Sequence, residues 1–412
     1  WEYDKNLNQT GFYKVITEEE YLENSLLSTN KACKDRENIL WVATDTRVFK
    51  INPSHQYFNS ITTKNKILSN NYVRAINIDS SQHLWVGSRY GLIMDKLKLN
   101  TSEYGLVIEN EPTIPFRFNH GTLVVNQLCK TQKNEMLVAT YRGLYAIKNN
   151  KINYLPNINR NENKEIVRQV WAIQQLGDGS FLLGTRYTGL TRLSEDMQSL
   201  QPMDIEVNGG NTWDPLTCVW NFFEDANNNL WVLTSHGLYK AISIGQKKIV
   251  LKKITQLKSY SVWTACQTKD KQLWVGSIEG GIYCFDSTDK FIKNITVQDG
   301  LPSTSICALI TDDYDNVWVS TPSAITKINV KNTRQTATYN YSDGVVVSGF
   351  NYKAVAKDKQ GNIFFGTKKG IVYFHPSSFE NQPNYAAPFL MMRKVLSEYQ
   401  RCFATLLLNI GH

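Results

Sequence analysis

Three turns of this chain each place an arginine next to a tyrosine. A guanidinium can bind carboxylate or sulfate through two parallel hydrogen bonds, and an aromatic face packs against a sugar ring. The pattern therefore favours a site for a sugar. The pattern also favours an acidic ligand, because the turns marked by glycines carry many basic residues and one acidic residue, Glu279. The candidate ligand-binding residues are Arg89, Tyr90, Tyr141, Arg142, Arg186, Tyr187, Trp213, His236 and Lys368.

A second interpretation of the same pairs needs no ligand. An arginine stacked on a tyrosine can cover the end of a folded core and contribute to stability alone. Residues that would support catalysis are sparse, since His236 is the one histidine of six that falls in these turns. Zinc-binding, nucleophile-elbow and phosphate-loop motifs are absent from the sequence. We expect no catalytic residue, metal or cofactor, and an enzyme alternative would depend on His236 with Glu279.

The elements that must position these turns are visible as a repeat. A short apolar phrase recurs at intervals of 43 to 52 residues. Such a period, with one apolar strand per unit, is typical of β-propeller blades. We predict an all-β propeller with eight repeat units and four-stranded antiparallel blades, either eight-bladed or with seven blades plus one extra repeat. The eight copies are Leu40–Thr44, Leu84–Ser88, Met136–Thr140, Phe181–Thr185, Leu230–Thr234, Leu273–Ser277, Val317–Thr321 and Ile363–Thr367.

Conserved spacings within the repeat predict the build of one blade. An aspartate six residues before the bulky second position is expected to cap the turn that leads into the apolar strand. The small fourth residue of the phrase predicts a close approach of adjacent blades, and its final Ser or Thr is expected to bond backbone groups at the strand end. A segment at about 11–17 is expected to close the last blade, which removes an open sheet edge. The aspartates are Asp35, Asp79, Asp225, Asp312 and Asp358.

Length, charge and cysteine content narrow the class of protein. The 412 residues carry a net charge of +8, which is modest for this length and does not indicate nucleic-acid binding. The seven cysteines include no C-x-x-C pair, and Cys33, Cys129 and Cys266 occupy one slot of the repeat. We expect them to be small buried hydrophobes. Because the chain begins at Trp1 and holds no apolar stretch of bilayer length, we interpret it as a fragment or a processed chain.

Two copies of the repeat resemble the two-component-regulator propeller repeat, whose pattern is roughly D-x-x-G-x-L-W-x-G-T-x-x-G-L. They run from Asp79 to Leu92 and from Asp358 to Ile371, and Asp299–Ser303 resembles the D-G-L-P-S segment that precedes the first strand in that family. Tyr373–Pro376 resembles the passage into a Y_Y_Y immunoglobulin-like domain, although the chain departs from that pattern after about 390. We therefore expect a propeller over 1–378 and, over 379–412, a linker with the truncated start of such a domain.

The resemblance implies the periplasmic sensor region of a hybrid two-component system of the Bacteroidetes type. In such proteins the propeller precedes a transmembrane helix, a histidine kinase and a DNA-binding regulator, and many members sense oligosaccharides. It therefore implies an oligosaccharide ligand, a homodimer in the full-length protein, no nucleic-acid contact in this region, and a membrane link only through a downstream helix. A propeller lyase or hydrolase and an interaction scaffold without a small ligand remain the alternatives.

Overall fold

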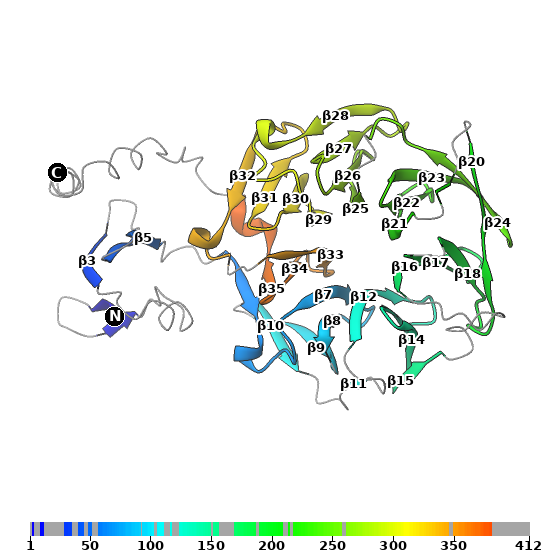
Figure 1. Cartoon of the computed structure of the whole chain (residues 1–412). Coiled ribbons are helices and arrows are strands. Elements are labelled where there is room, and N and C mark those ends of the chain that lie inside the picture. Colours follow the sequence, from blue (N-terminus) through cyan, green and yellow to red (C-terminus); the bar gives the residue numbers. More distant parts are fainter. Residues whose placement is uncertain are drawn as a thin grey trace. The chain divides into compact units, whose positions relative to one another are not determined.

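The chain forms two compact units in a computed structural model (Figure 1). One unit is Phe58–Pro376, and the other combines Trp1–Tyr57 with Ser377–His412. The structure describes residues 2–3, 9–11, 29–34, 40–44, 48–51, 57–91, 93–102, 105–110, 116–117, 123–149, 151–155, 169–186, 189–208, 213–214, 217–257, 261–345 and 349–380.

The unit that combines Trp1–Tyr57 with Ser377–His412 contains the first copy of the repeated phrase. Its strands form an antiparallel pair and an antiparallel three-stranded sheet. The phrase Leu40–Thr44 is the central strand of that sheet, β4. The strands are β1 (Glu2–Tyr3), β2 (Gln9–Gly11), β3 (Thr29–Lys34), β4 (Leu40–Thr44) and β5 (Val48–Ile51).

The unit Phe58–Pro376 is a ring of antiparallel β-meanders (Figure 1). Its first two meanders share one nine-stranded sheet, because β12 pairs with β13 and also with β8. The strands of these two are β7 (Val73–Ile78), β8 (His83–Gly91), β9 (Ile93–Ser102) and β10 (Gly105–Asn110), followed by β11 (Phe116–Arg117), which pairs with β9, and then β12 (Leu123–Lys130), β13 (Met136–Thr140), β14 (Gly143–Lys148) and β15 (Lys151–Tyr154).

The next meanders continue around the ring in chain order. Within them, β20 adds a parallel strand beside β24. They comprise β16 (Val170–Gln175), β17 (Phe181–Thr185), β18 (Leu190–Leu193) and β19 (Leu200–Pro202); β20 (Asp204–Asn208), β21 (Val219–Glu224), β22 (Leu230–Thr234), β23 (Gly237–Ile244) and β24 (Lys248–Lys253); β25 (Val262–Gln267), β26 (Leu273–Ser277), β27 (Ile282–Phe285) and β28 (Phe291–Ile295); and β29 (Ala308–Thr311), β30 (Asn316–Ser320), β31 (Ile325–Asn329) and β32 (Thr336–Tyr339).

The last sheet closes the ring by joining the two ends of this unit. It contains β33 (Phe350–Lys357), β34 (Ile363–Thr367) and β35 (Gly370–Phe374), and its outer strand is β6 (Asn59–Ile61) from the start of the unit. This outer position was expected for the segment at about 11–17, of which residues 12–17 lie outside the described part of the chain. Because 59–61 supplies the strand, residues before Phe58 are not needed to complete the ring. Short 3₁₀ turns are η1 (Thr63–Asn65), η2 (Val297–Asp299), η3 (Tyr341–Asp343) and η4 (Pro376–Phe379).

The predicted all-β, propeller-like architecture is confirmed, whereas the count of eight blades is not. The first copy of the phrase lies in the other unit, and hydrogen bonds merge the first two meanders of the ring into one sheet. The first strands of successive meanders contact one another in order, and β33 contacts β7. Figure 1 shows these first strands nearest the centre of the ring.

The four described aspartates six residues before the bulky position cap their turns as predicted, and Asp35 lies outside the described residues. One oxygen of Asp312 accepts the backbone N–H groups of Tyr314 and Asn316 at 2.8 and 2.9 Å. Its other oxygen accepts the indole N–H of Trp318 at 2.8 Å. Because of the six-residue spacing, one carboxylate holds both the backbone of the turn and the indole of the core tryptophan. Asp79 bonds Trp85 and Asp225 bonds Trp231 in the same way.

The small fourth residue of the phrase brings neighbouring meanders into contact, as predicted. A Cβ built on Gly184 would lie 2.6 Å from Val219 of the next meander, and one on Gly276 would lie 2.6 Å from Ile306. At Gly366 the neighbour is Val73, 2.8 Å away, which is where the last sheet meets the first. A side chain at these positions would force the strands apart, because cores are packed without spare volume.

The hydroxyl at the end of the phrase bonds the backbone in six copies. Thr140, for example, donates to the carbonyl of Gly143 at 2.8 Å, which closes the turn after the strand. The exception among the described copies is Ser88, whose buried hydroxyl has no partner there. In that copy β8 runs on to Gly91 and pairs with β12, so that no tight turn follows the phrase. The other five hydroxyls belong to Thr185, Thr234, Ser277, Thr321 and Thr367.

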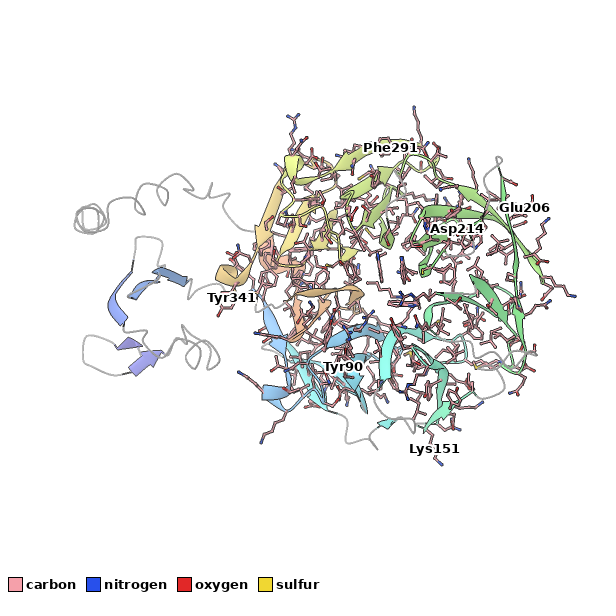
Figure 2. All side chains as sticks on the ribbon, viewed as in Figure 1. Tyr90, Lys151, Glu206, Asp214, Phe291 and Tyr341 are labelled. Carbon is pink, nitrogen blue, oxygen red and sulfur yellow. The ribbon has the colours of Figure 1, made fainter. Side chains whose placement is uncertain are left out.

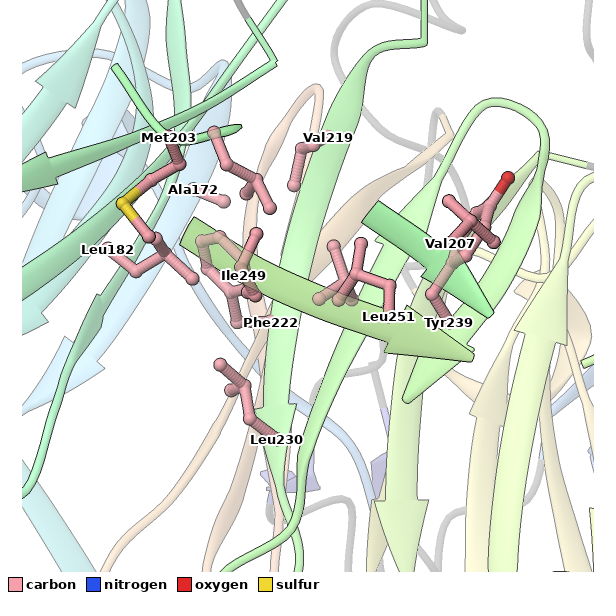
Figure 3. Close-up of a cluster of buried hydrophobic side chains, with 12 residues drawn as sticks. Ala172, Leu182, Met203, Val207, Val219, Phe222, Leu230, Tyr239, Ile249 and Leu251 are labelled. Carbon is pink, nitrogen blue, oxygen red and sulfur yellow. The ribbon is translucent and has the colours of Figure 1, made fainter. Parts of the chain in front are cut away.

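Apolar clusters between neighbouring meanders make up the core, and Figure 3 shows one of them. Leu182 and Val232 are fully buried there, and Trp213 packs against the same cluster. Among the described cysteines, Cys266, Cys284 and Cys307 are buried, as predicted for Cys266, whereas Cys129 and Cys218 are half-buried. Burial raises the pKa of Cys129 to about 11 and that of Cys307 to about 12.

The turn aspartates predict how stability depends on pH. Burial alone would raise the pKa of Asp225, but the hydrogen bonds from Trp231, Asn229 and the backbone outweigh it and lower the pKa. A carboxyl with a lowered pKa stabilises the fold above its unfolded pKa, about 3.9 for Asp, and this contribution is lost as the pH falls through the folded pKa. We expect the free energy of unfolding, measured with urea between pH 2 and 7, to fall below about pH 4. Asp225→Asn should flatten that fall, and an identical profile in the variant would contradict the assignment.

Candidate functional site

Five first strands of the meanders share a local irregularity that turns one side chain out of the sheet, whereas β29 pairs with β30 without it. In β7, Val73 pairs with Ser88 and Ala75 pairs with Gly87, so that Arg74 between them has no partner on β8. A bulge of this kind re-aims the side chain that it displaces. The same step occurs in four further strands and displaces Asn126 in β12, Trp171 in β16, Trp220 in β21 and Trp263 in β25.

The last sheet contains a larger version of the same irregularity. Phe350 pairs with Thr367 and Val355 pairs with Phe365, so the segment Asn351–Ala354 faces the single residue Gly366. Lys353 lies within it at φ 53°, a left-handed conformation that costs a side-chain-bearing residue about 1–3 kcal/mol. The irregularity therefore displaces Tyr352 and Lys353 at the point of the strand where the bulges of β7, β12, β16, β21 and β25 displace one residue each.

The three displaced tryptophans pack together at the inner strands. Trp220 and Trp263 are stacked, with ring centroids 4.4 Å apart and an angle of 10°. Trp171 meets both edge-on at 4.8 and 5.7 Å, and Tyr352 lies 4.8 Å from Trp263. Ser261 accepts the indole N–H groups of Trp220 and Trp263, each at 2.9 Å. The indole N–H of Trp171 is buried and has no acceptor among the described residues.

Two basic side chains lie beside these tryptophans. The Arg74 guanidinium lies 5.3 Å from the centroid of Trp171. The Lys353 ammonium donates to the carbonyl of Trp220 at 2.6 Å and to that of Trp171. Burial, with a smaller contribution from Arg74, lowers the pKa of Lys353 well below its usual value. We call Arg74, Trp171, Trp220, Trp263, Tyr352 and Lys353 the central cluster.

The predicted arginines and tyrosines make contacts with one another and with the central cluster. Arg89 lies 4.7 Å from the ring of Tyr90 and 5.4 Å from that of Tyr72, and it donates to the Tyr72 hydroxyl at 3.2 Å. Arg186 donates to the Tyr141 hydroxyl at 3.3 Å, and Tyr141 lies 5.7 Å from Trp171. We call Arg89, Tyr90, Tyr141, Arg142 and Arg186 the Arg–Tyr rim.

Arg74 interacts electrostatically with both arginine–tyrosine groups of the rim, with Arg89 and Tyr90 of one and with Tyr141 of the other. Burial lowers the pKa of Arg74, Tyr72 opposes this effect, and smaller contributions come from Arg89, Tyr141 and Tyr90. Tyr90 and Tyr141 therefore both lie close enough to Arg74 to act on it electrostatically. The hydroxyl and ring contacts of Arg89 also agree with the interpretation in which arginine stacks on tyrosine for stability.

The other candidate residues lie apart or have different surroundings. Trp213 packs against the core, 5.3 Å from Tyr239, and Lys368 is exposed in the turn between β34 and β35. Tyr187 lies outside the described residues. His236 is 3.7 Å from Asp214, and the described structure shows no contact between His236 and Glu279. Figure 2 shows Tyr90 and Asp214 in separate parts of the ring.

The displaced residues of the central cluster share a position that is visible in the sequence. Arg74, Trp171, Trp220 and Trp263 each follow a buried valine that pairs with the Ser or Thr at the end of the phrase. The recurring Val-x step at the start of a strand is the signal that could have identified Arg74 and Trp220.

A shallow pocket of about 190 Å³ lies elsewhere, between the first two meanders. Its lining includes Asp79, His83, Lys96 and Lys130. His83 begins β8 and Arg89 lies near its end, so the pocket and the Arg–Tyr rim are at opposite ends of the strand. In the described part of the chain, no three His, Cys, Asp or Glu side chains converge to hold a metal ion. The described residues also include no helix with the length and hydropathy to span a membrane.

Comparison with known proteins gives one family match and several distant relatives. Residues 67–90 match the model of the family "Two component regulator propeller". The expected resemblance to that family is therefore confirmed at this repeat. A curated relative, Histidine kinase P4 of Formosa agariphila, is 21% identical over 309 residues, which is 73% of this chain and 20% of that protein. This chain thus corresponds to about one fifth of that relative.

A solved structure agrees on the fold. A virginiamycin B lyase from Staphylococcus aureus superposes with a TM-score of 0.55 at 12% identity over 77% of this chain and 98% of that one. The extracellular domain of a putative hybrid two component system from B. thetaiotaomicron gives a TM-score of 0.42 at 15% identity, with 84% of this chain and 56% of that chain covered. At such identity the likeness to the lyase concerns the propeller fold.

Proposed function

Because residues 67–90 form a two component regulator propeller repeat, we propose that this chain is the ligand-binding sensor region of a hybrid two-component signalling protein. The family match is the observation that carries the proposal. The relative named as a histidine kinase supports it, since this chain corresponds to part of a much longer protein of that kind. In this proposal the ring lies in the periplasm and the signalling domains lie elsewhere in the full-length protein.

The proposed ligand is an oligosaccharide, with an acidic one favoured, and the Arg–Tyr rim is its proposed contact surface. The rim offers Arg89 and Arg186 as cations and Tyr90, 56% exposed, as an aromatic face. The enzyme alternative depended on His236 with Glu279, whereas His236 lies beside Asp214. We also propose the count of seven blades plus one extra repeat, because β6 closes the ring without the strands around Leu40–Thr44.

Signal transfer in this proposal acts through association. Each meander is packed against its neighbours without room for a Cβ at Gly184, Gly276 or Gly366. A ring of this kind resists internal deformation, so a ligand would shift the equilibrium of an interface or a hinge. The proposed interface joins two copies of the full-length protein.

Replacing the three rim arginines together tests the ligand site. Arg89→Gln, Arg142→Gln and Arg186→Gln in one variant should weaken binding of the cognate oligosaccharide by at least about 100-fold, because charged hydrogen bonds contribute about 1.5–3 kcal/mol each and the loss of two of them is sufficient for this. Calorimetry against a panel of neutral and acidic oligosaccharides measures this. A matched control, Lys133→Gln, Lys271→Gln and Lys359→Gln, makes the same charge change at turns that precede the apolar strands and should bind as the wild type does.

The other outcomes separate the alternatives. Equal affinity in the rim variant and the control would rule out the rim as the contact surface. No binding by any sugar of the panel would favour a protein-interaction scaffold. Turnover of a panel sugar by the purified wild type would favour an enzyme.

A further inference from the structure

We propose that the central cluster is a binding site for an oxyanion, a carboxylate or sulfate group, held between Arg74 and Lys353 beside Trp171. The proposal does not depend on recognition of an oligosaccharide by the Arg–Tyr rim. It rests on the charges at the inner strands, on their unused hydrogen-bond donors and on the irregularities that place them there.

The first observation is a pair of basic side chains without a counter-ion. The Arg74 guanidinium lies 5.3 Å from the ring of Trp171, and the Lys353 amine donates to the Trp171 carbonyl. Burial, with a smaller contribution from Arg74, disfavours the charged form of Lys353 and lowers its pKa. Among the described residues, no carboxylate forms an ion pair or a hydrogen bond with either. Partial removal of two like charges from water is unfavourable unless an opposite charge compensates them. An anion from outside the chain would supply that compensation.

The second observation is a set of donors without acceptors. The Arg74 guanidinium has five N–H groups, and the structure shows no hydrogen bond from it to a described residue. The indole N–H of Trp171, a residue only 6% exposed, also lacks an acceptor there. The two-point fork of an arginine matches a carboxylate or sulfate in geometry as well as in charge. The region therefore offers donors of the kind that an oxyanion requires.

The third observation is how the residues are positioned. Arg74 is displaced by the bulge of β7, and Lys353 lies in the larger irregularity of β33 with a left-handed backbone. These two strands meet where the ring closes, and Asn351 donates to the carbonyl of Val73 there. Bulges and strained residues concentrate at functional sites because the surrounding structure has to hold them in place. The first and last sheets of the ring thus bring one basic side chain each to Trp171, Arg74 to its ring and Lys353 to its carbonyl.

The test uses the whole chain and small anions as probes. Isothermal titration calorimetry and tryptophan fluorescence are measured with sodium sulfate, sodium acetate, sodium glucuronate and glucose at constant ionic strength. We expect saturable binding of at least one anion and none of glucose. Binding of sulfate or acetate would identify a free anion as sufficient, whereas binding of glucuronate alone would show that the anionic group belongs to a larger acidic ligand.

Variants assign the binding to the central cluster. Arg74→Gln and Lys353→Gln should each lower the affinity for the bound anion at least tenfold, and Arg74→Lys should give an intermediate value because it keeps the charge without the fork. Lys327→Gln is the matched control, since Lys327 lies 6.0 Å from the ring of Trp318 outside the cluster. Thermal melts verify folding. If Lys353→Gln does not fold, Arg74→Gln decides, because that side chain forms no hydrogen bond to a described residue.

The absence of saturable binding by any of the three anions would overturn the proposal, and so would the same affinity in Arg74→Gln, Lys327→Gln and the wild type. Binding of glucose as strong as that of glucuronate would also overturn it, because the charge would then be irrelevant. These results leave the rim proposal standing, since that one is tested by neutral and acidic oligosaccharides on different variants.

Discussion

Asp312→Ala should lower the free energy of unfolding by about 3–5 kcal/mol, because it leaves several buried donors without an acceptor. Asp312 is 3% exposed and accepts from two backbone N–H groups, the side-chain amide of Asn316 and the indole of Trp318. The indole N–H is enclosed in the core and has no route to water once the carboxylate is removed. Urea unfolding at pH 7 measures the loss.

The neighbouring residue supplies the control for this prediction. Asp313→Ala removes an exposed carboxylate that pairs with Lys357 at 3.0 Å, and surface pairs of this kind contribute about 0–1 kcal/mol. A double-mutant cycle with Trp318→Phe then isolates the bond to the indole, for which we expect a coupling of about 1–2 kcal/mol. A coupling near zero would show that the six-residue spacing between aspartate and tryptophan reflects the turn alone.

Phe58→Ala should destabilise the ring by about 3–5 kcal/mol, the usual cost of removing a buried aromatic side chain. Phe58 is 2% exposed and packs against Phe374 of β35 at 5.1 Å and against Tyr339 of β32 at 5.4 Å. It therefore anchors β6 to two meanders at the point where the ring closes. Thermal unfolding gives the overall loss, and amide hydrogen exchange locates it.

Exchange separates this prediction from a general loss of stability. Amides of β35 that bond β6 should lose protection in Phe58→Ala before those of β26 do, because removing the anchor frees a sheet edge. Tyr314→Ala, an exposed aromatic residue, is the control and should change stability by no more than about 0.5 kcal/mol. Uniform loss of protection across the ring would argue against β6 as a separate closing element.

The apolar phrase predicted its strands well because each copy is buried on both faces and bounded by a capped turn. Ring closure was not predicted in its actual form, since the segment at about 11–17 was expected as the closing strand, whereas 59–61 takes that place. Its partner β35 lies some 310 residues along the chain, and a local pattern contains no information about such a pairing.

The residues of the candidate site that lie in turns were predicted, whereas those inside strands were not, for a similar reason. Arg89, Tyr141 and Arg186 were found because they stand next to glycines that mark turns, which are recognisable from residue type. Arg74 and Lys353 lie inside strands, where an alternating pattern does not reveal that a bulge has displaced a side chain. The bulge is a property of two paired strands, so it becomes visible only when their register is known.

The pairing of β6 with β35 also determines how the ring would respond to tension. Asn59 stands opposite Tyr373, so the polypeptide enters and leaves this unit at adjacent points of one sheet. A pull applied to both ends would load that single pair of strands first and open it residue by residue, while the other sheets carried no force. The mechanically weakest joint of the ring is therefore also the place where its two ends meet.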